Sequence, residues 1–471
     1  MFEVFLLYDV NPTTWFYLSL LMITGIFFKF RRVWSVRNLD LFLLLLLGPG
    51  LLLIARDFYF GYVMVLTSIM LLMMRMICDP MMVRRPLLEV NLSRGGLIFT
   101  CVALMVFQIA SVVLIQTSDY ESQISAPLEQ LITYHLNDRL VTLDLEREMN
   151  PELPADEKTQ TENKAQLVHG PGLPFFTKLC DFPRQWRYDL LKKKRLEQMT
   201  DQTADESVPP QTYQLDQFPI FPITQIRLTI FLSILAQLAI VLGIVLVSWK
   251  HFENFNTGIA AATLYMLLPY VAQMPSRLDH LIPAALLVWA VFSWRLPSLA
   301  GILLGTAAAL SYYPIFLIPL WCAFYWSKGF WRFFIMSLGT FLLLIAISIP
   351  LSGGWNAFLA QSGDIFGCVG LFSRNAAGFW DISEHSVFYR LPVIAIYLVL
   401  VFILTFWPSQ KNFGTLMSSS AALMAGAQFC HPFQGGTYMA WFLPLMILVI
   451  FRPNLENRTA ARGIGRHLHR I

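Results

Sequence analysis

Charged residues are scarce in this chain. Of its 471 residues, 34 are Lys or Arg and 30 are Asp or Glu, which together make up 14% of the sequence, whereas 56% are hydrophobic. A soluble domain typically carries about 25% charged residues, so this composition excludes a water-soluble protein of this length. The formal net charge of +4 is small, and we expect no nucleic-acid partner.

Cysteine is also rare, and the motifs of common cofactor sites are missing. The six Cys are far apart, without a Cys-x-x-Cys pair, and most are interpreted as small apolar membrane residues. The sequence has no P-loop, no Rossmann glycine pattern, no His-Glu-x-x-His motif and no nucleophile elbow in a supporting context. No defined cofactor is therefore predicted. The acidic residues of one long loop leave a divalent cation open, but without the spacing of a known site.

Long hydrophobic runs are the abundant feature. They approach or exceed the roughly 20 residues needed to cross a bilayer, and they recur along most of the chain. The sequence therefore predicts an all-α membrane protein with about thirteen transmembrane helices. The expected spans lie near 14–30, 39–55, 58–77, 96–116, 227–249, 257–273, 280–294, 297–311, 313–327, 331–351, 391–407, 413–430 and 437–451.

Lys and Arg in the short loops predict the orientation, because they accumulate on the cytoplasmic side. With alternating spans, nearly all of them fall on one side if the N-terminus is outside and the C-terminus is cytoplasmic. This places a large loop, 117–225, outside. Within it, segment 119–135 can form an amphipathic helix and segment 170–182 is apolar with turn residues, and both are expected on the membrane surface. The predicted cytoplasmic cations lie at 29–37, 75–94, 250, 295, 328–332, 411 and 452–470.

Residues 296–326 are the most informative stretch, LPSLAGILLGTAAALSYYPIFLIPLWCAFYW. Two apolar runs meet at Ser-Tyr-Tyr-Pro (311–314), and small residues, including Gly301, Gly305 and Ala308, follow the first run. Small residues let membrane helices approach closely, and Pro breaks or kinks a helix. The stretch therefore predicts a tight helical hairpin whose turn lies at a membrane interface.

The order of features over residues 96–451 resembles the GT-C membrane glycosyltransferases. In that class a span leads into an external loop that opens with an acidic residue, here Asp119. A polar external turn follows, here 274–280, and then a Gly-rich helix that ends in a Tyr-Tyr-Pro turn. An external Tyr, here Tyr438, precedes the last helix.

The resemblance divides the chain into three parts. Residues 1–95 form a three-span N-terminal addition, residues 96–451 form the GT-C-like transmembrane core with external loop 117–225, and residues 452–471 form a basic cytoplasmic tail. It implies an integral protein of a bacterial inner membrane. Its activity would be that of the mannosyltransferase-like branch, which moves a hexose or pentose from a polyprenyl-phosphate carrier to an extracytoplasmic acceptor. One departure is Ser311, where many relatives carry Lys, so another cation must bind the donor phosphate if the chain is active.

Asp119 is the candidate general base. Inverting sugar transfer needs a carboxylate that accepts the proton of the acceptor hydroxyl, and a position just outside the membrane can meet a lipid-linked donor. Glu121 and Asp138 are reserve candidates. The alternative is an ordinary acidic residue at an interfacial helix end.

Arg277 and Asp279 concentrate charge in a very short turn between two spans, where ionisable groups tend to be functional. Arg277 is a candidate for binding the carrier phosphate, and Asp279 either binds substrate or pairs with Arg277. His280, beside them, is interpreted as structural. Further candidates for substrate binding on the same side are Tyr312, Tyr313, His431 and Tyr438, with Arg374 in loop 352–390 in reserve.

Two other functions stay open. A transporter or flippase of a lipid-linked substrate would also place charged residues in a cavity, but no repeat relates the two halves of the chain. A non-catalytic membrane scaffold, or a degenerate relative of the enzymes, would explain the missing Lys at position 311.

Overall fold

The computed structural model describes residues 12–56, 58–82, 90–125, 222–273, 277–351, 355, 378–380, 386–431 and 435–465. Over these ranges the chain is helical and forms no β-strand, and one isolated bridge joins Asn412 to Thr459. The main helices are α2 (Pro12–Phe27), α3 (Val36–Ile54), α4 (Tyr59–Cys78), α5 (Arg94–Ser125), α10 (Pro222–His251), α11 (Phe255–Leu267), α12 (Pro269–Gln273), α13 (Leu278–Phe292), α14 (Pro297–Ser311), α15 (Leu317–Phe324), α16 (Phe330–Leu351), α18 (Ser386–Phe406), α19 (Phe413–Cys430), α20 (Leu443–Phe451) and α21 (Ala460–Gly465). Short 3-10 helices are η2 (Asp79–Met81), η4 (Tyr313–Phe316), η6 (Gly378–Trp380) and η7 (Met439–Trp441).

Six segments of the described chain are long and apolar enough to cross a membrane. They are Val36–Ile54, Tyr59–Met81, Arg94–Val113, Ile230–His251, Phe330–Pro350 and Tyr389–Phe406. On α16 and α18, large side chains such as Leu343 and Phe402 are exposed, as expected for surfaces that face lipid. The protein is therefore an integral membrane protein. Helices also occupy the other expected spans, but α20 has only 9 residues and α11 only 13, so the count of thirteen stays a prediction.

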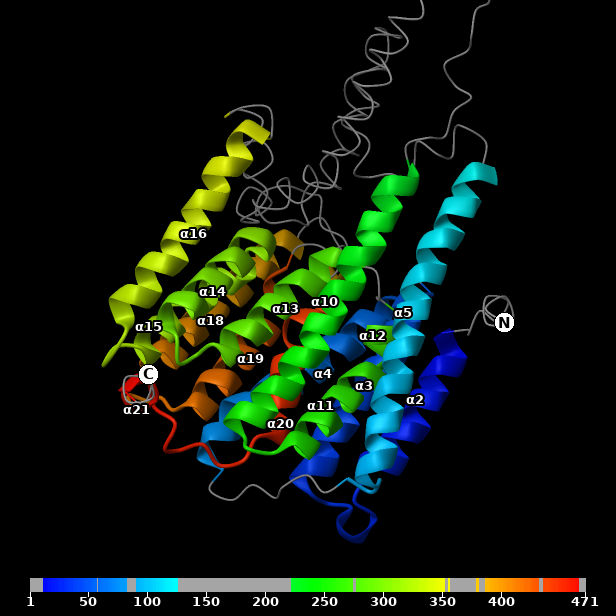
Figure 1. The fold of residues 1–471 in the computed structure, drawn as a ribbon, viewed down its shortest axis with the longest axis horizontal. Helices are drawn as coiled ribbons and strands as arrows, with labels where there is room; N and C mark the ends of the chain where they lie inside the picture. The colour runs from blue at the N-terminus through cyan, green and yellow to red at the C-terminus, as the bar shows by residue number, and fades with distance from the viewer. Residues whose placement is uncertain are drawn as a thin grey trace, which may run out of the picture.

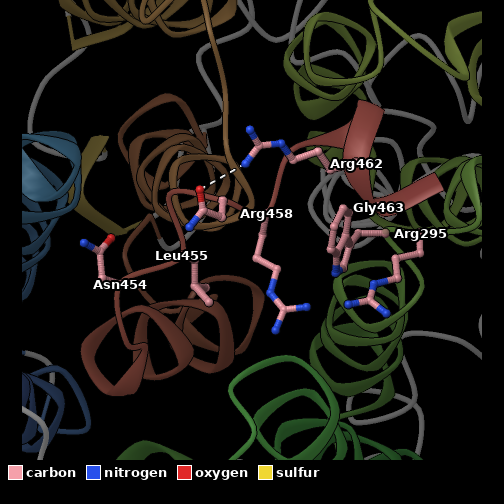
Figure 2. Close-up of a pocket in the computed structure, with 8 residues that line it drawn as sticks. Arg295, Asn454, Leu455, Arg458, Arg462 and Gly463 are labelled. Atoms are coloured by element: carbon pink, nitrogen blue, oxygen red, sulfur yellow. Dashed lines mark hydrogen bonds between the residues drawn. The ribbon is translucent and has the colours of Figure 1, made fainter. Parts of the chain in front are cut away.

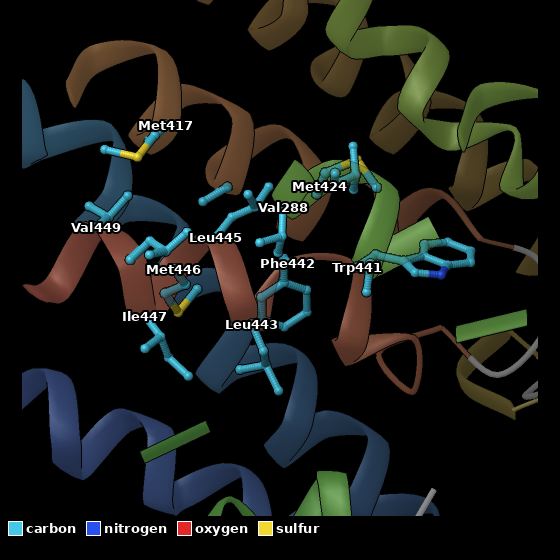
Figure 3. Close-up of a cluster of buried hydrophobic side chains, with 14 of the residues drawn as sticks. Val288, Met417, Met424, Trp441, Phe442, Leu443, Leu445, Met446, Ile447 and Val449 are labelled. Carbon is cyan, nitrogen blue, oxygen red and sulfur yellow. The ribbon is translucent and has the colours of Figure 1, made fainter. Parts of the chain in front are cut away.

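Helix α19 lies at the centre of the bundle (Figure 1). Every residue of this helix except Phe429 is buried, and α4, α15, α18 and α20 pack against it. Its run of Ser and Ala residues (418–422) keeps the helix thin, which lets its neighbours approach closely. Figure 3 shows the apolar contact with α20, where Met424 and Leu445 belong to one continuous core.

Small residues of α14 bring a neighbouring helix into close contact, as the sequence predicts, but that helix is α16 and not α15, the second run of the predicted hairpin. A Cβ atom added to Gly301 would lie 2.6 Å from the carbonyl oxygen of Phe333, and one added to Gly305 would lie 2.3 Å from that of Ser337. Ala308 continues this stripe and is fully buried. The end of α14, and with it the turn that follows, is thereby fixed against α16.

Three buried charged side chains, Asp40, Asp79 and Arg452, and the half-buried Arg75 connect α3, α4 and the segment after α20. The Arg75 guanidinium lies 3.0 Å from a carboxylate oxygen of Asp40 and 3.1 Å from one of Asp79. Arg452 donates from Nε to the second Asp79 oxygen at 3.1 Å. Sequence analysis treats Arg75 and Arg452 as markers of the cytoplasmic side, but the structure shows that both neutralise buried carboxylates.

The connecting turns sort into two groups at opposite ends of the bundle. At one end, the Trp294 ring stacks on Phe413 at 4.9 Å, and the backbone N–H of Phe413 donates to Arg458 at 2.7 Å. At the other end, Tyr59 stacks on Phe379 at 5.9 Å, and the turns at 277–280, 312–316 and 431–438 meet. These two groups match the predicted cytoplasmic and external turns, and which end faces the cytoplasm stays a prediction.

Candidate functional site

Six aromatic and histidine side chains from distant parts of the chain meet at the predicted external end. Tyr438 is their centre, with its ring 4.7 Å from that of His280, 4.5 Å from that of His431 and 4.6 Å from that of Trp441. Each of these four side chains is at most 3% exposed. We call this set the aromatic-histidine cluster, and its members are Tyr270, His280, Tyr313, His431, Tyr438 and Trp441.

The first wall of the cluster comes from α12 and α13. The Tyr270 hydroxyl shares a short hydrogen bond with Nδ1 of His280, and the two rings are nearly parallel at 6.1 Å. His280 lies in the first turn of α13, which begins directly after Arg277. Sequence analysis treats His280 as structural, but the structure places it against Tyr438 in the middle of the cluster.

The second wall is the Tyr-Tyr-Pro turn. Tyr312 ends α14 with φ +67° and ψ −56°, a conformation that bulky L-residues rarely adopt and that costs on the order of 1–3 kcal/mol. The turn reverses the chain into η4 and directs Tyr313 into the cluster, 5.3 Å from His431 and 5.8 Å from Trp441. Strain of this kind persists only where the surrounding structure imposes it, and it is concentrated at functional sites.

The third wall is the return from α19 to η7. The side-chain amide of Gln428 donates to the carbonyl oxygen of Tyr438 and accepts from its N–H, both at 3.2 Å. Gly436 supplies a φ of +91° just before it, a conformation that suits glycine. These contacts hold Tyr438 opposite His431 although the two residues lie on different segments.

A buried cation borders the cluster. Arg390, on α18, is 1% exposed and lies within electrostatic range of Tyr313 and Cys430. Two turns along the same helix, Tyr397 is 4% exposed, and its hydroxyl has no hydrogen-bond partner in the part of the chain that the structure describes. A guanidinium at this depth suits a phosphate, because it offers several N–H donors in one plane.

Sequence reasoning missed Arg390 because this residue directly precedes the expected span 391–407, where a cation is ordinary. The available signal is its place in the apolar sequence VFYRLPVIAIY (387–397), where a lone ionisable residue is costly. Tyr397 gives no such signal, because Tyr is common in membrane segments.

The structure brings together four of the predicted substrate-binding residues. His431 contacts both Tyr313 and Tyr438, and the Tyr312 ring lies 5.6 Å from that of Tyr313. Arg277 is the exposed residue that directly precedes α13.

The remaining predicted residues are not tested by these contacts. Asp119 and Glu121 lie on the terminal turns of α5, which extends past the ends of most other helices at this end (Figure 1), and their side chains lie outside the described residues. The side chain of Asp279 and the whole of Asp138 and Arg374 also lie outside them. Most of external loop 117–225 falls in the same category.

The described cluster combines several hydrogen-bonding groups with one nearby cation. Three Tyr hydroxyls and two imidazoles can donate or accept, and Arg390 supplies positive charge. Across the described ranges, no three His, Cys, Asp or Glu side chains come close enough to hold a metal ion.

Comparisons of the chain with protein-family models, curated proteins and solved structures find no match.

Proposed function

We propose that this protein is a polytopic glycosyltransferase of the GT-C type, which moves a sugar from a polyprenyl-phosphate carrier to an acceptor outside the cytoplasm. The observation that supports this best is the aromatic-histidine cluster beside Arg390. Four of the turns that sequence analysis assigns to the external side contribute to this one site. In this proposal the chain crosses the membrane about thirteen times, and the cluster end of the bundle faces outward.

Arg390 takes the role of the Lys that many relatives carry at the position of Ser311. The Ser311 hydroxyl donates to the carbonyl oxygen of Ala307 in its own helix, at 3.2 Å, and is buried. Ser311 therefore cannot supply charge to a phosphate. Arg390, buried on α18 near Tyr313, supplies that charge in this proposal.

The reaction is a single displacement at the anomeric carbon of the sugar. The acceptor oxygen forms a bond to this carbon while the bond to the carrier phosphate oxygen breaks, and the electron pair of that bond leaves with the phosphate. Asp119 accepts the proton of the acceptor hydroxyl. Arg390 stabilises the charge that develops on the leaving phosphate. Arg277, exposed at the N-terminal end of α13, binds the carrier phosphate as the donor enters the site.

The test is sugar transfer by the purified protein in proteoliposomes. Labelled polyprenyl-phosphate hexoses and pentoses serve as donors, and release of the carrier phosphate is measured together with product. We expect turnover with at least one donor, and we expect Asp119→Asn to lower it by about 10²-fold or more at unchanged protein yield.

Arg390 is tested by two variants, since a neutral residue at a buried position risks misfolding. Arg390→Lys keeps the charge but loses the planar set of donors, so transfer should fall less than in Arg390→Gln. Arg332→Gln, at an exposed position on α16, is the matched control. Absence of transfer with every lipid-phosphate sugar would replace this proposal by the scaffold function, and full activity in Asp119→Asn would remove that residue from the mechanism.

A further inference from the structure

A second polar site lies at the opposite end of the bundle from the aromatic-histidine cluster. It is a cavity of about 460 Å³, within the range of small-molecule sites. His280 in the cluster and Trp294 in the cavity lie 14 positions apart along α13 and its end. At the rise of a helix, this separation places the two sites about 20 Å apart. The residues that line the cavity are Trp294, Arg295, Asn454, Leu455, Asn457, Arg458, Arg462 and Gly463 (Figure 2).

The segment after α20 builds this cavity by crossing the turn between α13 and α14. Its path is fixed at Arg458, whose carbonyl oxygen accepts from the N–H of Phe413, and at Thr459, which bridges to Asn412. Farther along, Gly463 lies flat on the Trp294 indole, where an added Cβ would come within 2.4 Å of the ring. The cavity therefore has a defined shape with a rigid aromatic floor.

The lining is strongly positive. It contains three guanidinium groups and two amide side chains, and none of the eight residues is acidic. Figure 2 shows the side chains of Arg295 and Arg458 extending toward the same side of the cavity. Arg295 lies over the Trp294 ring at 5.4 Å, and Arg462 donates to Asn457 at 3.0 Å, so both are held in place.

Two carboxylates bind side chains of the lining: Glu456 accepts from Asn454 at 3.0 Å, and Glu253 competes for the arginine charge. Glu253, in the turn after α10, pairs with Arg458, but its side chain is 74% exposed whereas that of Arg458 is 22% exposed. An exposed pair of this kind contributes little, because water and salt screen it. A ligand with two or more phosphate oxygens offers Arg458 a stronger, bidentate partner.

We propose that this cavity is a binding site for a phosphate-bearing anion, held by Arg295, Arg458 and Arg462 with Asn454 and Asn457 as additional donors. The proposal is independent of the glycosyltransferase function, because the site shares no residue with the cluster. Exposed aromatic side chains, Trp326 and Trp331, occur at this end of the bundle, as they do where a protein meets a membrane interface. The phosphate belongs either to a membrane lipid headgroup or to a soluble phosphorylated molecule.

Two binding measurements distinguish these sources. In the first measurement, inorganic pyrophosphate is titrated into the full-length protein in nanodiscs of neutral phosphatidylcholine, and its binding is measured. In the second, part of the phosphatidylcholine is replaced by anionic phosphatidylglycerol, and the stability of the protein is measured. Saturable pyrophosphate binding supports the site with a soluble ligand. Stabilisation by phosphatidylglycerol without pyrophosphate binding supports the site with a lipid headgroup.

Variants decide whether binding occurs in this cavity. Arg458→Gln should weaken binding about tenfold, since it removes charge-assisted hydrogen bonds. Arg462→Gln, at an exposed position with little effect on folding, should weaken it as well. Glu253→Gln should strengthen binding, because it releases Arg458, and this gain distinguishes a ligand site from a merely structural set of arginines.

Arg332→Gln is again the control, since Arg332 is exposed at the same end and does not line the cavity. It should bind as the parent does. The proposal is overturned if neither probe binds, if Arg332→Gln and Arg458→Gln lose binding equally, or if Glu253→Gln binds no better than the parent.

Discussion

Substitution of Gly305 by Ala tests whether the contact between α14 and α16 holds the Tyr-Tyr-Pro turn in place. The new methyl group would lie 2.3 Å from the carbonyl oxygen of Ser337, which is backbone and cannot rotate away. Overpacking of this kind typically costs about 1–3 kcal/mol, and we expect the upper end here because two helices must separate. Ala gains about 1 kcal/mol of helix propensity over Gly, which leaves a net loss of about 2 kcal/mol.

Gly339→Ala is the matched control for this change. Gly339 lies on α16 itself, and nothing stands within 4 Å of the position its Cβ would take. The gain in helix propensity is the same in both variants, so the difference between them, about 3 kcal/mol, isolates the helix contact. Unfolding is measured in one detergent by denaturant titration and by thermal melting. Equal stability of the two variants would refute the close packing of α14 on α16.

Other features of the structure give further predictions. Asp79→Asn should destabilise the protein by about 3–5 kcal/mol, because it leaves buried guanidinium charge uncompensated. Glu253→Gln removes an exposed carboxylate and should change the free energy of unfolding by less than about 1 kcal/mol. Denaturant unfolding compares the two variants, and similar losses would contradict the role of burial. Tyr312→Gly should relieve backbone strain but lose ring contacts, and because these effects oppose each other, stability should change little. Sugar transfer should fall, and unimpaired transfer would show that the turn has no role in the reaction. A Cys introduced at Ser207 should react with an impermeant reagent from outside intact cells, and protection until lysis would reverse the predicted orientation.

The helical architecture follows largely from the sequence. Hydrophobic runs locate the helices, and the small residues of 296–311 predict a close helix contact at Gly301 and Gly305, which the structure confirms. The partner is α16, whereas the sequence pairs this run with 313–327. Less predictable are the short helices: η4 occupies four residues directly after the turn, and α15 then runs for only eight. The positive φ of Tyr312 has no sequence signal either, because tertiary contacts impose it against the preference of the residue.

The candidate site is predictable only in part, for a related reason. Charge in the loops assigns 277–280, 312–313 and 431–438 to one side, and this suffices to expect Tyr313, His431 and Tyr438 near each other. It does not reveal Arg390, since burial of a cation depends on which helices surround it. Likewise Arg75 has the appearance of a cytoplasmic surface cation in the sequence, and its partners Asp40 and Asp79 become apparent only once the helices are packed.

The ion pair between Asp79 and Arg452 has a consequence for how the protein is made. The two residues are 373 positions apart, and a ribosome adds Arg452 after nearly every membrane helix has been synthesised. Until then Asp79 has Arg75 as a partner but lacks the Arg452 guanidinium that it binds in the folded protein. Arrival of the C-terminal segment thus completes the first hairpin, so a nascent chain released before residue 452 would present Asp79 without this second partner to the quality control of the membrane.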